Sequence, residues 1–381
     1  MTNQAAVEMK VNPGLDGIVA AQTRLSCIDG QAGELIIAGF PVEELASKAT
    51  FEETVYLLWY DTLPNAAQLA DFRQALAARR ALPQITQLVL NAAAAQKIPV
   101  MDALRMAVSS ISSQASRDMH QDALILVACF PTIVATYWRL LNGQEPIAPR
   151  ADLNHAANYL YMLSGQIPSP ERVRGMETYL NTVVDHGLNA STFTARVIIS
   201  TQSDLISAIT GAIGALKGPL HGGAPGPALD MVLEIGEPSR AEPYLRAKLE
   251  QDERLMGFGH RVYKVRDPRA EVLSAAAERL FRTDGDTKLY ELARHVEQVA
   301  VALLAEYKPG RNLQTNVEFY TALLLHGLGL PTDLFTPTFA ISRVAGWIAH
   351  CFEQQAANRL IRPQSVYIGV KGRRWIPLEA R

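Results

Sequence analysis

Residues 289–310, LYELARHVEQVAVALLAEYKPG, contain the pattern that decides the fold class. Apolar side chains recur there at every third or fourth position, at Leu289, Leu292, Val296, Val299 and Leu303. This spacing places them on one face of an α-helix. Pro309 and Gly310 follow, and residues of these types end helices. We therefore predict one amphipathic helix in this stretch.

Helix signals of the same kind occur elsewhere. Ser169 and Pro170 are typical of an N-cap and a first helical position, and we expect that helix to continue towards Val184. A further helix begins at residues 203–204, keeps its apolar residues on one face, and ends at residues 218–219.

Strand signals are few and lie near the two ends of the chain. Residues 25–28 and 35–37 flank Asp29–Gly30 in the manner of a short hairpin. Residues 366–368 are typical of an edge segment. The predicted fold class is therefore mainly α, a two-domain helical fold with minor N- and C-terminal β segments.

Composition narrows the class of protein. The chain has 381 residues, of which 48% are hydrophobic and 19% charged, and its formal net charge is -2. A length of this order suits about two globular domains with ample core. The balanced charge argues against a dedicated nucleic-acid-binding protein. Cys27, Cys129 and Cys351 form no C-x-x-C motif, which indicates a reducing compartment and argues against a zinc ribbon or redox motif.

The chain shows no sign of export or of a membrane span. Residues 1–14 lack the charged start, apolar core and cleavage site of a secretory signal. The longest nearly uncharged stretch, residues 123–138, is shorter than the roughly 20 residues that span a bilayer and includes Pro131. We interpret it as a buried, kinked helix. We expect a cytoplasmic protein that binds neither membrane nor nucleic acid.

Two segments rich in glycine and proline divide the chain. They are residues 218–227, GPLHGGAPGP, and residues 327–331, GLGLP. They predict a large domain of residues 1–222 and 331–381 and a small inserted domain of residues 223–330, joined by hinges around a cleft. On spacing alone, two ordinary helix–helix loops are an equal alternative.

Histidine and basic residues gather in two candidate segments. His221 lies between small residues, before a helix expected near Gly226, where an imidazole can stay neutral and donate an N–H to a carbonyl oxygen. Residues 257–269, GFGHRVYKVRDPR, lack the third glycine of a dinucleotide fingerprint. Their basic cluster suits phosphates or carboxylates. The alternatives are a loop histidine without function and a solvated basic face.

Three further places could carry chemistry. Residues 185–192, DHGLNAST, are unusually polar and could equally be a capped helix junction. Glu318 lies among apolar neighbours, where desolvation would raise its pKa towards that of a useful base, unless it is a peripheral glutamate. Arg343 is a lone cation in an apolar helix and needs a carboxylate or a bound anion. Metalloprotease, P-loop and serine-hydrolase motifs do not occur.

Taken in order, these segments resemble the citrate synthase family. The resemblance rests on HGLNASTFTAR, GPLHGGA, MGFGHRVYKVRDPR, NVEFY, ISRVAGWIAH and RLIRPQSVYIG, and on the opening GLDGIVAAQTRLSCIDGQAGELIIAG. By length the chain is similar to the short prokaryotic dimeric type. The resemblance implies an all-α homodimeric transferase of the tricarboxylic acid cycle with a shared active site. It implies oxaloacetate and acetyl-CoA as substrates, and neither a metal nor a cofactor.

The resemblance also implies roles for individual residues. His221 would stabilise the enol, His260 would polarise the ketone of oxaloacetate, and Glu318 stands where the family has its aspartate base. Ligands of oxaloacetate and citrate would be His186, Arg269, Arg343 and, from the neighbouring subunit, Arg362. Coenzyme A would contact Arg254, Leu255, Met256, Gly257, Phe258, Gly259 and Asn316.

These roles predict citrate synthesis: a base deprotonates acetyl-CoA, the enol carbon attacks oxaloacetate, and citryl-CoA is hydrolysed. The extra methylene of Glu318 moves its carboxylate, and a misplacement of about 1 Å can cost around 10²-fold in rate. Two alternatives stay open. One is a 2-methylcitrate synthase that uses propionyl-CoA, and the other is a weakly active paralogue with a binding or regulatory role.

Overall fold

The computed structural model describes residues 11–111, 118–222, 225–260, 263, 265–284 and 287–381. Residues 1–10, where no secretory signal is expected, and Arg261 and Lys264 of the basic cluster lie outside the described residues. Helices dominate the described chain, and the predicted mainly α class is confirmed.

The first part of the chain contains the helices α1 (Val42–Lys48), α2 (Phe51–Tyr60), α3 (Ala66–Ala77), α4 (Gln84–Ala95), α5 (Val100–Ser110), α6 (Met119–Leu141), α7 (His155–Ser164), α8 (Pro170–Thr182), α9 (Ala190–Ser200) and α10 (Leu205–Leu216). The second part contains α11 (Pro225–Ile235), α12 (Pro238–Glu250), α13 (Pro268–Asp284), α14 (Thr287–Tyr307), α15 (Val317–Gly327) and α16 (Phe335–Ala356). Short 3₁₀ helices are η1 (Pro13–Leu15), η3 (Thr332–Leu334) and η4 (Leu378–Ala380).

Side-chain caps explain where the predicted helices begin. The Ser169 hydroxyl accepts the backbone N–H of Arg172 at 3.3 Å at the start of α8, and Pro170 occupies the first turn. A carboxylate oxygen of Asp204 accepts the N–H of Ser207 at 2.7 Å at the start of α10. These caps satisfy N–H groups that have no partner within the helix. Both predicted starts are confirmed, as is the helix that became α14.

The predicted N-terminal hairpin is also confirmed. Strands β1 (Ser26–Asp29) and β2 (Glu34–Ile37) pair antiparallel, and β3 (Phe40–Pro41) adds a short third strand. A carboxylate oxygen of Asp29 accepts the N–H groups of Gln31 and Ala32 at 2.8 and 2.9 Å, which closes the turn.

The expected C-terminal β segment is wrong. Residues 366–368 are exposed and form no strand, and no described residue pairs with them. Their β-favouring side chains cannot decide the structure alone, because a strand is stabilised by a hydrogen-bonded neighbour.

The apolar stretch around Pro131 lies within α6. This helix of 23 residues is long and apolar enough to cross a membrane by length and composition, but most of its apolar window is buried inside the protein. It packs against α16 and α7. A core helix passes the same test as a membrane span, and burial identifies this one as a core helix.

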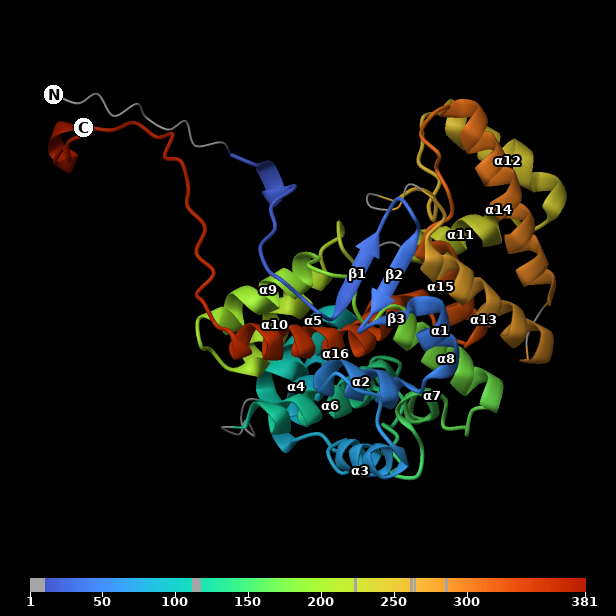
Figure 1. Cartoon of the computed structure of the whole chain (residues 1–381), viewed down its shortest axis with the longest axis horizontal. Coiled ribbons are helices and arrows are strands. Elements are labelled where there is room, and N and C mark those ends of the chain that lie inside the picture. The colour runs from blue at the N-terminus through green and yellow to red at the C-terminus, as the bar shows by residue number, and fades with distance from the viewer. Residues whose placement is uncertain (1–10, 112–117, 223–224, 261–262, 264, 285–286) are drawn as a thin grey trace.

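Figure 1 shows how the helices are arranged. Helix α16 runs through the middle of the helices α2 to α10, and it packs against α2, α6, α8, α9 and α10. Helices α12 and α14 pack together and project away from these helices. Helix α13 packs on both α8 and α15, and so connects the second part of the chain to the first. The domain boundaries at residues 222–223 and 330–331 stay a prediction.

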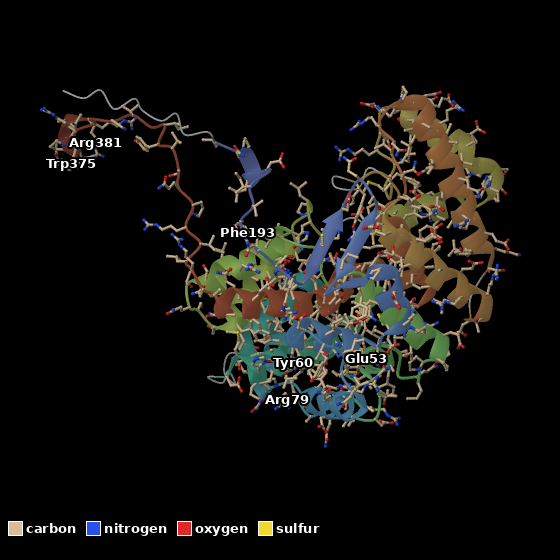
Figure 2. The ribbon with its side chains drawn as sticks, in the orientation of Figure 1. Glu53, Tyr60, Arg79, Phe193, Trp375 and Arg381 are labelled. Atoms are coloured by element: carbon tan, nitrogen blue, oxygen red, sulfur yellow. The ribbon has the colours of Figure 1, made fainter. Side chains whose placement is uncertain are left out.

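The C-terminal segment after α16 extends away from the helical body (Figure 1). Figure 2 marks Trp375 and Arg381 near its far end, and 78% of the Trp375 surface is exposed. Arg362 also lies on this exposed segment.

Candidate active site

One cavity collects most of the candidate residues. Its volume is about 220 Å³, and it lies between α8, α15, α16 and the loops before α9, α11 and α13. This is smaller than the roughly 300–1,000 Å³ typical of pockets for drug-sized ligands, so it suits a small metabolite. The lining residues are Tyr179, Val183, His186, Asn189, His221, Gly222, His260, Arg269, Val317, Glu318, Thr321, Phe339 and Arg343.

His221 is held in place through its ring nitrogen Nε2. The Oγ atom of Ser191 lies 2.7 Å from His221 Nε2, and it accepts the indole N–H of Trp347 at 3.0 Å. Burial, assisted by the positive charge of Arg343, lowers the pKa of His221 to about 4. The imidazole is therefore neutral at physiological pH, as the sequence analysis expected. Gly222 is required beside it, because an added Cβ would lie 2.3 Å from the carbonyl oxygen of Leu216.

His260 forms a cluster with Tyr263, Arg269 and Asp267. The backbone N–H of Tyr263 donates to His260 Nδ1 at 3.1 Å, so Nδ1 acts as an acceptor. Arg269 Nη2 lies 3.4 Å from that Nε2. Arg269 is buried and pairs with Asp267 through two hydrogen bonds of 3.0 and 2.8 Å. The alternative of a solvated basic face is therefore wrong for Arg269.

His186 lies next to this cluster. Its Nε2 is 3.1 Å from the Tyr263 hydroxyl, and its ring contacts that of His260 edge-on with centroids 6.0 Å apart. Burial first, and then the charges of Arg269 and Arg343, hold the pKa of His186 well below its usual value. His186 is therefore a neutral hydrogen-bonding group on the cavity wall.

Arg343 supplies a second buried cation. Its Nε donates to the carbonyl oxygen of Val183 at 2.8 Å, and its guanidinium lies 4.6 Å from the ring centroid of Phe339. Its two Nη groups donate no hydrogen bond to any residue that the structure describes, and burial lowers its pKa to about 10. A cavity with Arg343 and Arg269 in its wall favours an anion, and forked guanidiniums match carboxylates.

Glu318 faces these cations from the first turn of α15. The Asn316 side chain caps this helix and accepts the Glu318 N–H at 3.0 Å. The Glu318 carboxylate accepts no hydrogen bond from the described residues, and burial raises its pKa against the opposing effect of Arg269. The predicted desolvated carboxyl is therefore present, and the reading of Glu318 as peripheral is wrong.

The segment expected to contact coenzyme A borders the cavity without lining it. Phe258 forms an antiparallel bridge with Thr315, and the Asn316 amide donates to the carbonyl oxygen of Gly259 at 2.9 Å. Gly257 has a φ of +87°, and an added Cβ there would lie 2.9 Å from the Phe319 side chain. Only glycine fits this combination of conformation and space. Arg254 is exposed and Leu255 is buried.

Arg362 is the one predicted substrate ligand that lies apart from the cavity, on the exposed C-terminal segment. Four further residues contact the cavity residues and were not predicted from the sequence as their partners: Ser191, Trp347, Tyr263 and Asp267. All of them stand inside the motifs quoted for the resemblance, so their positions were visible but their contacts were not.

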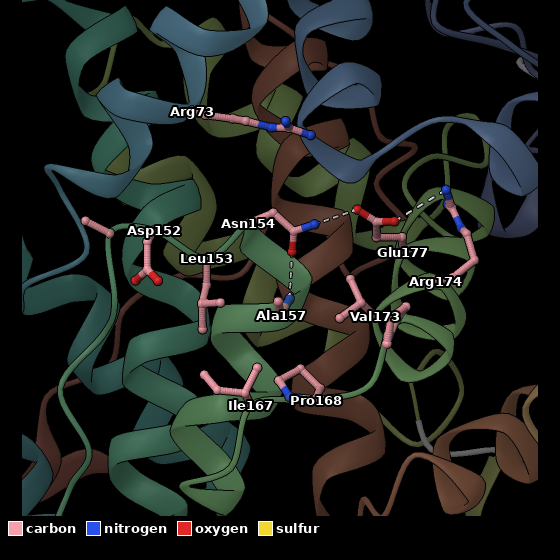
Figure 3. Close-up of a pocket in the computed structure, with 12 residues that line it drawn as sticks. Arg73, Asp152, Leu153, Asn154, Ala157, Ile167, Pro168, Val173, Arg174 and Glu177 are labelled. Carbon is pink, nitrogen blue, oxygen red and sulfur yellow. Dashed lines mark hydrogen bonds and ion pairs between the residues drawn. The ribbon is translucent and has the colours of Figure 1, made fainter. Parts of the chain in front are cut away.

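A larger cavity of about 700 Å³ lies elsewhere, between α3, α7 and α8. Figure 3 shows Glu177 there, accepting from Asn154 at 3.0 Å and paired with Arg174 at 3.3 Å. Burial raises the pKa of Glu177 to about 7. None of the described residues that line this cavity is a histidine, so it is the weaker candidate for a site that needs neutral imidazoles as hydrogen-bond donors.

Comparisons with known proteins agree with the geometry. The family model described as "Citrate synthase, C-terminal domain" matches residues 14–364. Citrate synthase 2 of Bacillus subtilis is 43% identical over 98% of this chain and 100% of its own length. The 2-methylcitrate synthase of Shewanella oneidensis is 39% identical, over 97% of each chain.

A solved structure extends the similarity to three dimensions. The citrate synthase of Thermoplasma acidophilum, solved in a ternary complex with carboxymethyl coenzyme A and oxaloacetate, superposes with a TM-score of 0.86. It is 30% identical and the match covers 97% of this chain and 99% of the other. With the helical fold, the cavity and the full-length similarity taken together, the chain belongs to the citrate synthase family.

Proposed function

We propose that this protein condenses acetyl-CoA with oxaloacetate and hydrolyses the citryl-CoA product to citrate and coenzyme A. The observation that carries the proposal is the meeting of His221, His260, Arg269, Glu318 and Arg343 in the wall of one small cavity. The solved ternary complex of a family member with oxaloacetate and a coenzyme A derivative supports the same substrates.

Oxaloacetate would bind through its carboxylates. No described residue accepts a hydrogen bond from the two Nη groups of Arg343, which could donate to the substrate, and Arg269 is oriented by Asp267. His186, which is neutral, would add a hydrogen bond without adding charge. The Nε2–H of His260 would donate to the ketone oxygen and make its carbon more electrophilic.

Acetyl-CoA would be activated by Glu318 and His221. Glu318 removes a proton from the acetyl methyl group, and neutral His221 donates a hydrogen bond to the thioester oxygen as it gains charge. The carbon then attacks the ketone carbon of oxaloacetate, whose oxygen takes a proton. Water cleaves the thioester of the resulting citryl-CoA, which releases citrate and the coenzyme A thiol.

Coenzyme A would lie along residues 254–259 and Asn316, next to Glu318. Residues 223–330 would act as a small domain that closes over oxaloacetate, because water must be excluded during enolisation. Arg362 would reach the cavity of a second subunit in a homodimer with shared active sites. The exposure of its own segment supports this arrangement.

The reaction is tested by release of free thiol on mixing the protein with acetyl-CoA and oxaloacetate, with either substrate omitted as the blank. We expect thiol release that needs both substrates, and citrate as the product by mass spectrometry. Absence of thiol release over a range of pH would contradict the proposed reaction.

A second candidate is 2-methylcitrate synthesis from propionyl-CoA, favoured by the similarity to the Shewanella enzyme. The same residues would serve both reactions. One methylene changes discrimination by only about 10- to 200-fold, so kcat/KM must be compared for acetyl-CoA and propionyl-CoA on one preparation. A higher value for propionyl-CoA would make 2-methylcitrate the main product.

A further inference from the structure

A chain of buried polar groups runs behind the cavity, from α9 through α16 to the residue before His186. Arg196 Nη1 lies 3.0 Å from His350 Nδ1, and His350 Nε2 lies 3.1 Å from a carboxylate oxygen of Asp185. Asp185 and His350 are completely buried. A guanidinium can only donate, so Nδ1 of His350 must accept and its proton must be on Nε2. His350 therefore donates to Asp185 in a single tautomer.

Asp185 in turn holds the backbone around His186. Its other oxygen accepts the Ser26 hydroxyl at 2.5 Å and the backbone N–H of Gly187 at 3.3 Å. The Gly187 N–H also donates to the Ser26 hydroxyl oxygen at 2.9 Å, so Asp185 and Ser26 together hold the backbone after His186. Ser26 lies on β1, so the hairpin fixes the same carboxylate from the other side.

Helix α16 lies directly on this backbone. At Gly346 an added Cβ would be 2.2 Å from the carbonyl oxygen of Val184 and 3.2 Å from Asp185. Arg343, Trp347 and His350 lie near Gly346 on the same side of the helix, at spacings of three and four. Arg343 binds Val183, His350 binds Asp185, and Trp347 binds Ser191. Three contacts from one helix thus fix the whole segment that carries His186.

We infer that Asp185 and His350 are positioning residues, which set the backbone of His186 and the guanidinium of Arg343 for binding a dicarboxylate. This rests on the proposed function, since it assigns the cavity to oxaloacetate. Neither residue lines the cavity. Asp185 also provides the negative charge that acts most strongly on Arg343. Without it, Arg343 would lose the attraction that keeps it between this backbone and the cavity.

The variants Asp185→Asn and His350→Leu test this inference. We expect each to raise the KM for oxaloacetate by about 10- to 100-fold, the size of effect that a misplacement of about 1 Å can have. The KM for acetyl-CoA should change by a much smaller factor. Dissociation constants for oxaloacetate from calorimetry should follow its KM.

Two milder variants distinguish a loss of positioning from a loss of folding. In His350→Gln the side-chain amide can donate to Asp185 and accept from Arg196, so it should restore most of the affinity lost in His350→Leu. Ser26→Ala, at a half-buried position, removes the hydrogen bond to Asp185 and the one accepted from the Gly187 N–H. It leaves the Asp185 carboxylate and its contact with His350 in place, so it should raise the KM for oxaloacetate by a smaller factor.

The matched control is His155→Leu. His155 is equally buried on α7, has no hydrogen-bond partner for its ring nitrogens among the described residues, and lies outside the cavity. Its oxaloacetate KM should equal that of the native protein.

The outcomes separate the two proposals. A native protein that binds oxaloacetate but releases no thiol contradicts only the proposed reaction. If the native protein is active and folded Asp185→Asn and Ser26→Ala both keep the native affinity for oxaloacetate, the positioning role is overturned. Equal losses in His350→Gln and His350→Leu would overturn it as well.

Discussion

The hydroxyl oxygen of Ser191 lies 2.7 Å from Nε2 of His221, at the first turn of α9. Ser191 has a single proton, and its contacts to Trp347 and Asn189 restrict how it can share that proton with the imidazole. Ser191 therefore helps to fix which ring nitrogen of His221 can donate to substrate. We expect Ser191→Ala to lower kcat by about 10- to 100-fold with little change in either KM.

Steady-state thiol release measures this effect. Ser164→Ala removes a hydroxyl that bonds Leu160 and Gln166 at the end of α7, outside the cavity, so it is the control and should keep the native kcat. An unchanged kcat in Ser191→Ala would show that His221 does not depend on this contact.

Glu318 should make activity depend on pH. Its pKa is raised by burial, and the proposed base must be ionised, so kcat/KM should fall as the pH drops through that raised pKa. Glu318→Gln should remove this dependence and lower kcat by about 10²- to 10⁴-fold. A pH profile of kcat/KM checks both points, and near-native activity in Glu318→Gln would contradict the role as base.

The length of the side chain at position 318 can be tested separately. We expect Glu318→Asp to lose about 10²-fold in kcat, because the cavity is formed around the longer carboxylate and the shorter one is displaced by about 1 Å. A large gain instead would mean that glutamate impairs the native site, as in a weakly active paralogue.

The two buried arginines should differ in their effect on stability. Arg269→Met leaves Asp267, which is fully buried, without its cation, and breaking a buried pair costs about 3–5 kcal/mol. Arg343→Met should cost far less, because Arg343 makes only one hydrogen bond to the residues that the structure describes, and burial already disfavours its charge. Denaturant unfolding measures the difference, and both variants should bind oxaloacetate poorly. Equal losses of stability would contradict this account.

Glu177 should make stability depend on pH. Burial raises its pKa from the ordinary value of about 4.5 to about 7 in the folded protein. Folding therefore favours its protonated form, and that contribution is lost as the pH rises from about 4.5 to 7. Glu177→Gln should become more stable relative to the native protein over this range, by roughly 1–3 kcal/mol. Glu291→Gln, at an exposed position on α14, is the control.

Arg362 and His221 should complement each other in mixed dimers. Arg362→Ala and His221→Ala should each be nearly inactive alone. A dimer of one chain of each kind retains one site with both native residues, so mixing after partial unfolding should restore activity. A verified mixed dimer that stays inactive would contradict the shared site.

The sequence predicted the fold where local chemistry determines it. The side chains of Ser169, Asp204 and Asp29 accept backbone N–H groups two or three residues further along the chain. The helices that begin at the first two and the hairpin closed by the third are present. Residues 366–368 were misread because a strand depends on a distant neighbour, which local composition cannot reveal.

The candidate site was predicted only in part for the same reason. Motifs named His221, His260 and Glu318, and the structure places all three on one cavity. Two contacts that hold the site join residues distant in sequence: Trp347 reaches Ser191 across 156 residues, and His350 reaches Asp185 across 165. Such pairs arise from the packing of α16 on the segment before α9, which no local pattern specifies.

The exposed C-terminal segment gives the protein an intrinsic optical probe. Trp59 and Trp347 are buried and Trp138 is partly covered, so Trp375 is the tryptophan most open to water. A collisional quencher such as acrylamide should therefore act mainly on Trp375. If a second subunit covers the segment, its emission should shift to shorter wavelength with rising protein concentration, and dimer assembly could be followed without any label.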